Sequence, residues 1–238
     1  MTHDIHELAL FTFESRSSIE DAVATALSAS TKAAHKAGRR ARIGLSGGSS
    51  PAPAYRNFAS MDLDWSRVDI ALVDDRWVDL DDGGSNEAMV RDAFKAATGV
   101  TIYGMKTPHG TPFAAQSILD TTYAALRPFD SIVLGMGPDA HTASWFSGSP
   151  QLASCLSAHS SQTVIGVDAS AASVSGAYPL RMTLTLPPIA EVEQIILLIY
   201  GDDKKQVLTN ALNTPVTEAP IRAVVEACGE RLVVFWAR

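Results

Sequence analysis

The chain has 238 residues, of which 46% are hydrophobic and 19% charged, and its formal net charge is −7 at pH 7. This composition is typical of a globular protein with a substantial core. The negative balance argues against nucleic acid or an anionic membrane as a partner, although a local cationic pocket could still hold a small anionic substrate.

Apolar runs of strand length alternate with helical patterns along the chain. The runs cover residues 8–13, 42–45, 68–73, 131–134, 163–167, 194–200 and 232–236. Ile19, Val23 and Leu27 repeat at helical spacing, and further helices are predicted at 85–95, 111–126, 202–212 and 221–228. Continuous apolar strands between amphipathic helices predict a Rossmann-like α/β fold of three layers, a mostly parallel sheet with helices on both faces. No linker divides the chain, so we expect one domain over residues 1–238.

No sequence feature indicates a membrane-spanning helix or a framework of disulfide bonds. No apolar run approaches the roughly 18 residues that a span needs, and the first residues lack the pattern of a signal peptide. Two cysteines, Cys155 and Cys228, are too few for a disulfide framework and lack metal-ligand spacing. We therefore expect a reduced, cytoplasmic protein.

A loop rich in glycine and serine follows the strand at 42–45. It contains Ser46, Gly47, Gly48 and Ser49, and Pro51 suits the first turn of a following helix. Glycines let the backbone approach a ligand closely, and free N–H groups at a helix start favour an anion. The loop is either such an anion cradle or an ordinary turn.

Two carboxylates and an arginine directly follow the buried strand at 68–73. Asp74, Asp75 and Arg76 could form a structural ion pair. They could equally supply a base or an orienting carboxylate beside an anion clamp. The pattern alone leaves both interpretations open.

The segment 131–146 combines a strand, a glycine turn and a titratable side chain. Gly135 and Gly137 follow the strand, Asp139 and His141 come next, and we expect a helix to start there. Open α/β proteins bind ligands at the carboxyl edge of the sheet, so this placement of His141 predicts chemistry rather than packing. Arg181 and Lys204 follow later as candidate cations, although a solvated surface role is the default for Lys204.

Two motif matches give competing interpretations. Residues 44–48 fit the G-x-S-x-G nucleophile elbow with Ser46 as nucleophile, but an elbow normally follows several strands and this one follows the second. Residues 135–140 fit a dinucleotide fingerprint, but Asp139 would repel a pyrophosphate and no acidic residue lies near position 160. Neither a serine nucleophile nor a nicotinamide cofactor is favoured.

Five motifs in order resemble those of the 6-phosphogluconolactonases, which share a fold with glucosamine-6-phosphate deaminase and ribose-5-phosphate isomerase. The motifs are GLSGGSSP (44–51), VDDRWV with SNEAMVRDAF (73–78 and 85–94), LGMGPDAHTASWF (134–146), RMTLTLPPI (181–189) and GDDKKQVL (201–208). The deaminases instead carry a His followed by Ile-Ala-Phe-Asn-Glu-Pro. Ala140 replaces the usual Gly, and would be strained by about 1 kcal/mol or more if that position needs a positive φ. Asp75 replaces the usual Glu.

The resemblance implies hydrolysis of 6-phospho-D-glucono-1,5-lactone to 6-phosphogluconate, in the oxidative pentose phosphate pathway. In our hypothesis His141 is the general base on water and later returns the proton to the ring oxygen. Asp139 or Asp74 would orient His141 or bind sugar hydroxyls. The loop 46–49 would supply backbone N–H donors.

The resemblance also implies how the anionic end of the substrate is held. Arg76, Arg181 and Lys204 would supply cationic contacts for the phosphate, and neither a metal nor a cofactor is expected. The partner would be a phosphorylated sugar lactone, and the protein a monomer or small homo-oligomer. Two alternatives remain: a deaminase-like aldose-ketose isomerase, and a non-catalytic sugar-phosphate-binding domain like those of some transcriptional regulators.

Overall fold

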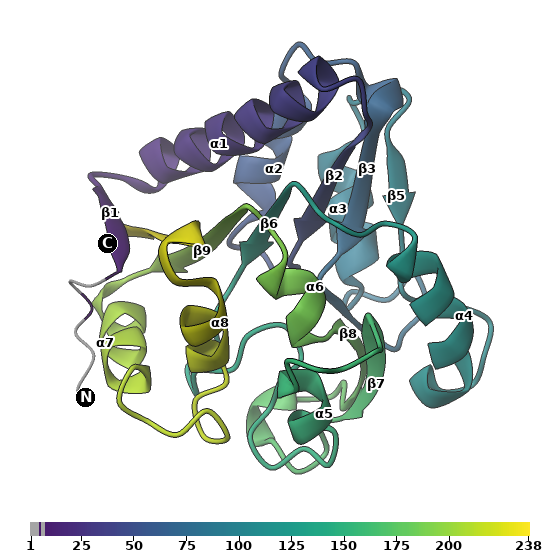
Figure 1. Cartoon of the computed structure of the whole chain (residues 1–238), viewed down its shortest axis with the longest axis vertical. Coiled ribbons are helices and arrows are strands. Elements are labelled where there is room, and N and C mark those ends of the chain that lie inside the picture. Colours follow the sequence, from purple (N-terminus) through teal and green to yellow (C-terminus); the bar gives the residue numbers. More distant parts are fainter. Residues whose placement is uncertain (1–4, 6–7) are drawn as a thin grey trace.

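The computed structural model describes Ile5 and residues 8–238. A seven-stranded parallel sheet forms its centre, with the strand order β1-β10-β9-β6-β2-β3-β5 (Figure 1). The strands are β1 (Ala9–Phe13), β2 (Ala41–Leu45), β3 (Val68–Leu72), β5 (Thr101–Tyr103), β6 (Ser131–Leu134), β9 (Gln194–Tyr200) and β10 (Leu232–Ala237). The predicted parallel sheet is confirmed, and six of its strands coincide within one residue with predicted runs.

Helices cover the sheet on both sides. They are α1 (Arg16–Lys36), α2 (Ala52–Ala59), α3 (Asn86–Ala93), α4 (Pro112–Ala124), α5 (Leu152–Leu156), α6 (Leu186–Ala190), α7 (Asp202–Ala211) and α8 (Ile221–Cys228). In one group α1 packs on α2 and α2 on α3, while α8 contacts both α6 and α7 in another (Figure 1). The three-layer α/β architecture is therefore confirmed.

Local sequence signals explain where the helices begin. The hydroxyls of Ser15, Ser85 and Thr111 accept hydrogen bonds from backbone N–H groups of α1, α3 and α4. Such N-caps satisfy donors that have no partner inside the helix. The predicted apolar stripe of α1 (Ile19, Val23 and Leu27) is buried, and Glu87 and Arg91, one turn apart on α3, form an ion pair at 2.8 Å.

A second, antiparallel sheet was not predicted. It consists of β4 (Asp74–Arg76), β8 (Leu180–Leu184) and β7 (Val164–Asp168), in the order β4-β8-β7. The run predicted at 163–167 is a strand, but assigning it to the parallel sheet was wrong. Its apolar residues are buried in either setting, so composition alone could not distinguish the two sheets.

Val73 joins the two sheets at the end of β3. Its N–H donates to the carbonyl of Leu45 (2.9 Å) in the large sheet, and its carbonyl accepts from the N–H of Leu184 (2.8 Å) in the small one. The chain therefore passes directly from one sheet to the other at this residue.

Cys155 and Cys228 are both buried free thiols. Among the described residues, no helix is long and apolar enough to cross a membrane.

Candidate active site

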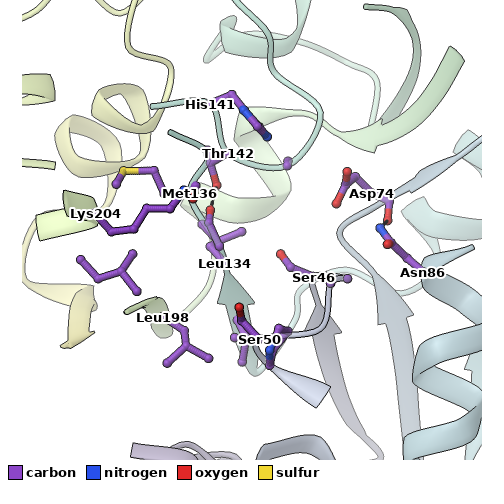
Figure 2. A pocket seen from close by; sticks show the side chains of 18 of the residues that line it. Ser46, Ser50, Asp74, Asn86, Leu134, Met136, His141, Thr142, Leu198 and Lys204 are labelled. Carbon is purple, nitrogen blue, oxygen red and sulfur yellow. Dashed lines mark hydrogen bonds between the residues drawn. The ribbon is translucent and has the colours of Figure 1, made fainter. Parts of the chain in front are cut away.

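A pocket of about 330 Å³ lies where the loops after β2, β6 and β9 face the small sheet. Figure 2 shows His141 and Thr142 on one side, Asp74 and Asn86 on another, Lys204 beside Met136, and the Ser46–Ser50 loop below. Of the residues predicted to form the site, eight line this pocket: Ser46, Gly47, Gly48, Asp74, Arg76, His141, Arg181 and Lys204. Segments far apart in the sequence thus converge on one cavity.

Asp139 is paired with His141 instead of lining the pocket. Its Oδ1 lies 2.5 Å from Nδ1 of His141, and the imidazole packs on Phe146 with ring centroids 4.4 Å apart. Burial pushes the pKa of Asp139 upward, but the hydrogen bond and charge of His141 outweigh it, so the pKa lies below its usual value. Nε2 of His141 forms no hydrogen bond with any described residue, so it is available to a ligand.

The loop that carries this pair is irregular, so the helix predicted to start after Gly137 is wrong. The N–H of Gly137 donates to the carbonyl of His141 (2.8 Å), and the N–H of Ala140 to the carbonyl of Gly137 (3.2 Å). Ala140 has φ 62° and Ala143 has φ 49°. Two left-handed residues close together cannot continue a right-handed helix. Ala140 therefore does occupy a position where glycine is less strained.

Gly137 is required by the His141–Asp139 pair itself. A Cβ at Gly137 would lie 2.1 Å from Nδ1 of His141 and 2.5 Å from Oδ1 of Asp139. No real Cβ approaches other atoms so closely, so a side chain here would displace both catalytic candidates. The glycine turn therefore makes room for the pair.

Two arginines face the pocket from the small sheet. Arg76 donates from Nη1 to the carbonyl of Gly84 (2.8 Å) and to Oδ1 of Asn86 (2.9 Å), while its buried Nε has no hydrogen-bond partner among the residues that the structure describes. Arg181 donates to the carbonyls of Tyr178 (2.6 Å) and Ser175 (3.1 Å). Burial lowers the pKa of Arg181 from its ordinary value. Both guanidinium groups are held in place by loop carbonyls.

Lys204, at the start of α7, supplies a third cation from the opposite side. Its Nζ donates to the carbonyl of Met136 at 2.7 Å. Burial lowers the pKa of Lys204, and the nearby Asp139 carboxylate opposes that effect. This side chain reaches the loop of His141, so the default expectation of a solvated surface lysine is wrong.

Asp74 is buried, and its partners are Ser144 and Asn86, not His141. Its Oδ2 accepts from the hydroxyl of Ser144 at 2.6 Å, and its backbone carbonyl accepts from Nδ2 of Asn86 at 2.9 Å. The sequence left open which carboxylate accompanies His141, and in the structure Asp139 makes that contact. Asp74 instead presents a fixed carboxylate to another part of the pocket.

The Ser46–Ser49 loop differs in detail from its expected role. The N–H of Ser46 is already used by the carbonyl of Val133 (3.1 Å), and Ser49 does not line the pocket whereas Ser50 does. Oγ of Ser46 is buried without a hydrogen-bond partner among the described residues, so no Ser46–His141 pair exists. A serine nucleophile activated by His141 has no support in this arrangement.

Asn86 is the main pocket residue that sequence reasoning did not single out. It is the first residue of α3 and bridges Asp74 and Arg76 with its side-chain amide. A helix-initiating Ser-Asn pair gives only a weak signal, because asparagine is common near helix starts for purely structural reasons. Within Ile5 and residues 8–238, no group of three His, Cys, Asp or Glu side chains could hold a metal ion.

Comparisons with known proteins find relatives along nearly the whole chain. The model of the glucosamine-6-phosphate isomerases/6-phosphogluconolactonase family matches residues 14–234. A 6-phosphogluconolactonase of Rhizobium meliloti is 34% identical, covering 94% of this chain and 97% of that protein, and one of Xylella fastidiosa is 36% identical, covering 83% and 82%. The crystal structure of a 6-phosphogluconolactonase from Shewanella baltica is 31% identical with a TM-score of 0.87, covering 99% of this chain and 100% of that one.

Proposed function

The chain belongs to the glucosamine-6-phosphate isomerase/6-phosphogluconolactonase family, and we propose that it hydrolyses 6-phospho-D-glucono-1,5-lactone to 6-phosphogluconate. It is then a carboxylic ester hydrolase of the oxidative pentose phosphate pathway. One observation supports this best: the His141–Asp139 pair opens onto a pocket that also holds three cationic side chains. An imidazole can act as the base in hydrolysis of a carboxylic ester, and the cationic side chains can bind the phosphate group of the same substrate.

In the proposed reaction His141 moves one proton. Nε2 accepts a proton from water as the water oxygen forms a bond to the lactone C1, and the carbonyl oxygen becomes an oxyanion. Asp139 stabilises the resulting imidazolium through Nδ1, 2.5 Å away. When the bond between C1 and the ring oxygen breaks, the imidazolium returns the proton to that oxygen, which becomes a hydroxyl group.

The other pocket residues would bind the substrate. Arg76, Arg181 and Lys204 supply positive charge for the phosphate, and backbone N–H groups of the Gly47–Ser50 part of the loop supply further donors. Asp74, held by Ser144, can accept hydrogen bonds from sugar hydroxyls. The proposed reaction requires neither a metal nor a cofactor. We further propose that residues 1–238 form a single domain and that the protein is cytoplasmic.

The test is an assay of freshly made lactone with and without the protein. The protein should accelerate lactone loss well above its spontaneous hydrolysis, and it should release no ammonia from glucosamine 6-phosphate in a parallel reaction. Ammonia release without lactone hydrolysis would establish the deaminase alternative. Binding of both sugar phosphates without turnover would indicate a binding domain.

A further inference from the structure

Asp75 lies directly behind the pocket wall, although it does not line the pocket. The residue is 1% exposed. Its Oδ1 accepts from the N–H groups of Arg76 (2.8 Å) and Asn86 (2.7 Å), and its Oδ2 accepts from the N–H of Glu87 (3.0 Å). One carboxylate therefore joins β4 to the start of α3.

Asp75 acts as a cap of α3 that comes from another element, the strand β4. The first N–H groups of a helix need partners outside it, and a carboxylate near them is favourable. The hydroxyl of Ser85 accepts from the N–H of Ala88 at 3.1 Å, while Asp75 accepts from the two preceding N–H groups, those of Asn86 and Glu87. The Asp75 carboxylate adds a connection between two elements that both contribute pocket residues.

Asn86 transmits this connection to the pocket. Its amide donates to the carbonyl of Asp74 (2.9 Å) and accepts from Nη1 of Arg76 (2.9 Å). A Cβ on Gly47 would lie 1.9 Å from the Asn86 amide, so the glycine loop packs directly against this side chain. A shift of Asn86 would therefore move both the Arg76 guanidinium and the loop.

We propose that Asp75 is a positioning residue for substrate binding, which fixes the Arg76 guanidinium by anchoring Asn86 to β4. The proposal rests on the lactonase function proposed above. Displacement of a binding group by about 1 Å can cost a large factor in affinity or rate, even when the altered residue does not touch the substrate. Because Arg76 is assigned to the phosphate and not to the reacting carbonyl, the effect should fall on KM.

The test must be made at a pH where Asp75 is ionised, because the proposal concerns its carboxylate form. Burial raises the pKa of Asp75 to about 7, and the N–H groups of Asn86 and Glu87 oppose the increase. At pH 8 the group is therefore mainly a carboxylate. Asp75→Asn keeps the shape but places an amide donor where one carboxylate oxygen now accepts an N–H.

The experiment is a double-mutant cycle between Asp75→Asn and Arg76→Ala, with KM and kcat measured for the lactone at pH 8. Asp75→Asn alone should raise KM at least about 10-fold and change kcat less than about 3-fold. In the Arg76→Ala background the same change should raise KM by less than about 2-fold, because the group that Asp75 positions is already absent. Equal increases in both backgrounds would overturn the proposal.

Asp120→Asn is the matched control. The Asp120 carboxylate accepts from two backbone N–H groups, those of Thr163 and Val164, and none of these three residues lines the pocket. It should lower the melting temperature without changing KM. A similar KM increase in this variant would show that Asp75→Asn acts through general destabilisation.

A second cycle covers the case in which Asp75→Asn does not fold. Asn86→Ala should then raise KM at least about 5-fold in the wild-type background and less than about 2-fold with Arg76→Ala. An unchanged KM in Asn86→Ala would overturn the proposal. Absence of lactone hydrolysis by the wild-type protein would instead contradict the proposed function, so the two failures are distinguishable.

Discussion

His141 presents its two ring nitrogens to different surroundings. Nδ1 is 2.5 Å from Oδ1 of Asp139, whereas Nε2 faces the pocket. Packing against Phe146 restricts the plane of the ring. A base that is already oriented loses little freedom when the substrate arrives, which is a condition for efficient proton transfer.

Replacement of His141 by alanine should remove proton transfer while leaving the cationic side of the pocket intact. We expect His141→Ala to lower kcat at least about 100-fold, with a much smaller change in KM. Initial rates on fresh lactone, corrected for spontaneous hydrolysis, measure the effect. His159→Ala, at an exposed position, is the control. Retention of kcat within a few-fold would exclude His141 as the general base.

At the scale of single residues, the sequence indicated which charged side chains come together at one pocket, but not which contacts they make. His141, Arg76 and Arg181 could be selected because polar residues beside apolar strands lie at a sheet edge. Asn86 and the position of Asp75 could not, because their contacts join residues about eleven positions apart through a turn of unknown shape. Which of Ser49 and Ser50 faces the pocket likewise depends on backbone geometry.

At the scale of elements, the loop after β6 differs most from expectation. Its glycine turn predicts the start of a helix, and the sequence leaves open whether Ala140 takes a positive φ. In the structure both Ala140 and Ala143 have positive φ. Tertiary contacts overcome the local cost, since the N–H of Ile221 in α8 donates to the carbonyl of Ala140 at 3.0 Å. A single sequence carries no direct sign of such a contact.

The same loop gives a prediction about Gly137. Gly137→Ala should lower kcat at least about 10-fold, because the methyl group would push His141 and Asp139 out of position. Gly135→Ala is the matched comparison two residues earlier, where an added Cβ meets no atom of the described chain within 4 Å, and it should lower kcat far less. Similar losses in the two variants would count against a specific role for Gly137.

At the scale of the whole molecule, the pocket lies between two sheets. Loops of β6 and β9 belong to the large sheet, while Arg76 and Arg181 belong to β4 and β8 of the small one. The sequence predicted the parallel sheet because its strands are apolar throughout. It did not predict the small sheet, because β4 consists of Asp74, Asp75 and Arg76 and has no apolar signal.

A ligand bound between the sheets should stabilise the whole fold. At 100 times its Kd, 6-phosphogluconate should add about 2.7 kcal/mol to the free energy of unfolding, or roughly 5–10 °C in melting temperature. Thermal unfolding with and without the ligand measures the shift. Gluconate at the same concentration should give a much smaller shift, because it lacks the phosphate. Equal shifts would show that the three cations do not select phosphate.

The position of β1 has a consequence for how the protein is made. In the sheet, β1 pairs with β10, so residues 9–13 contact a strand that begins at Leu232. During synthesis β1 is made before the other described strands of the sheet, whereas its partner β10 is made after them. The edge of β9 is likewise left open until β10 inserts between it and β1. A chain cut short before β10 would leave β1 without its partner and one edge of β9 open to aggregation.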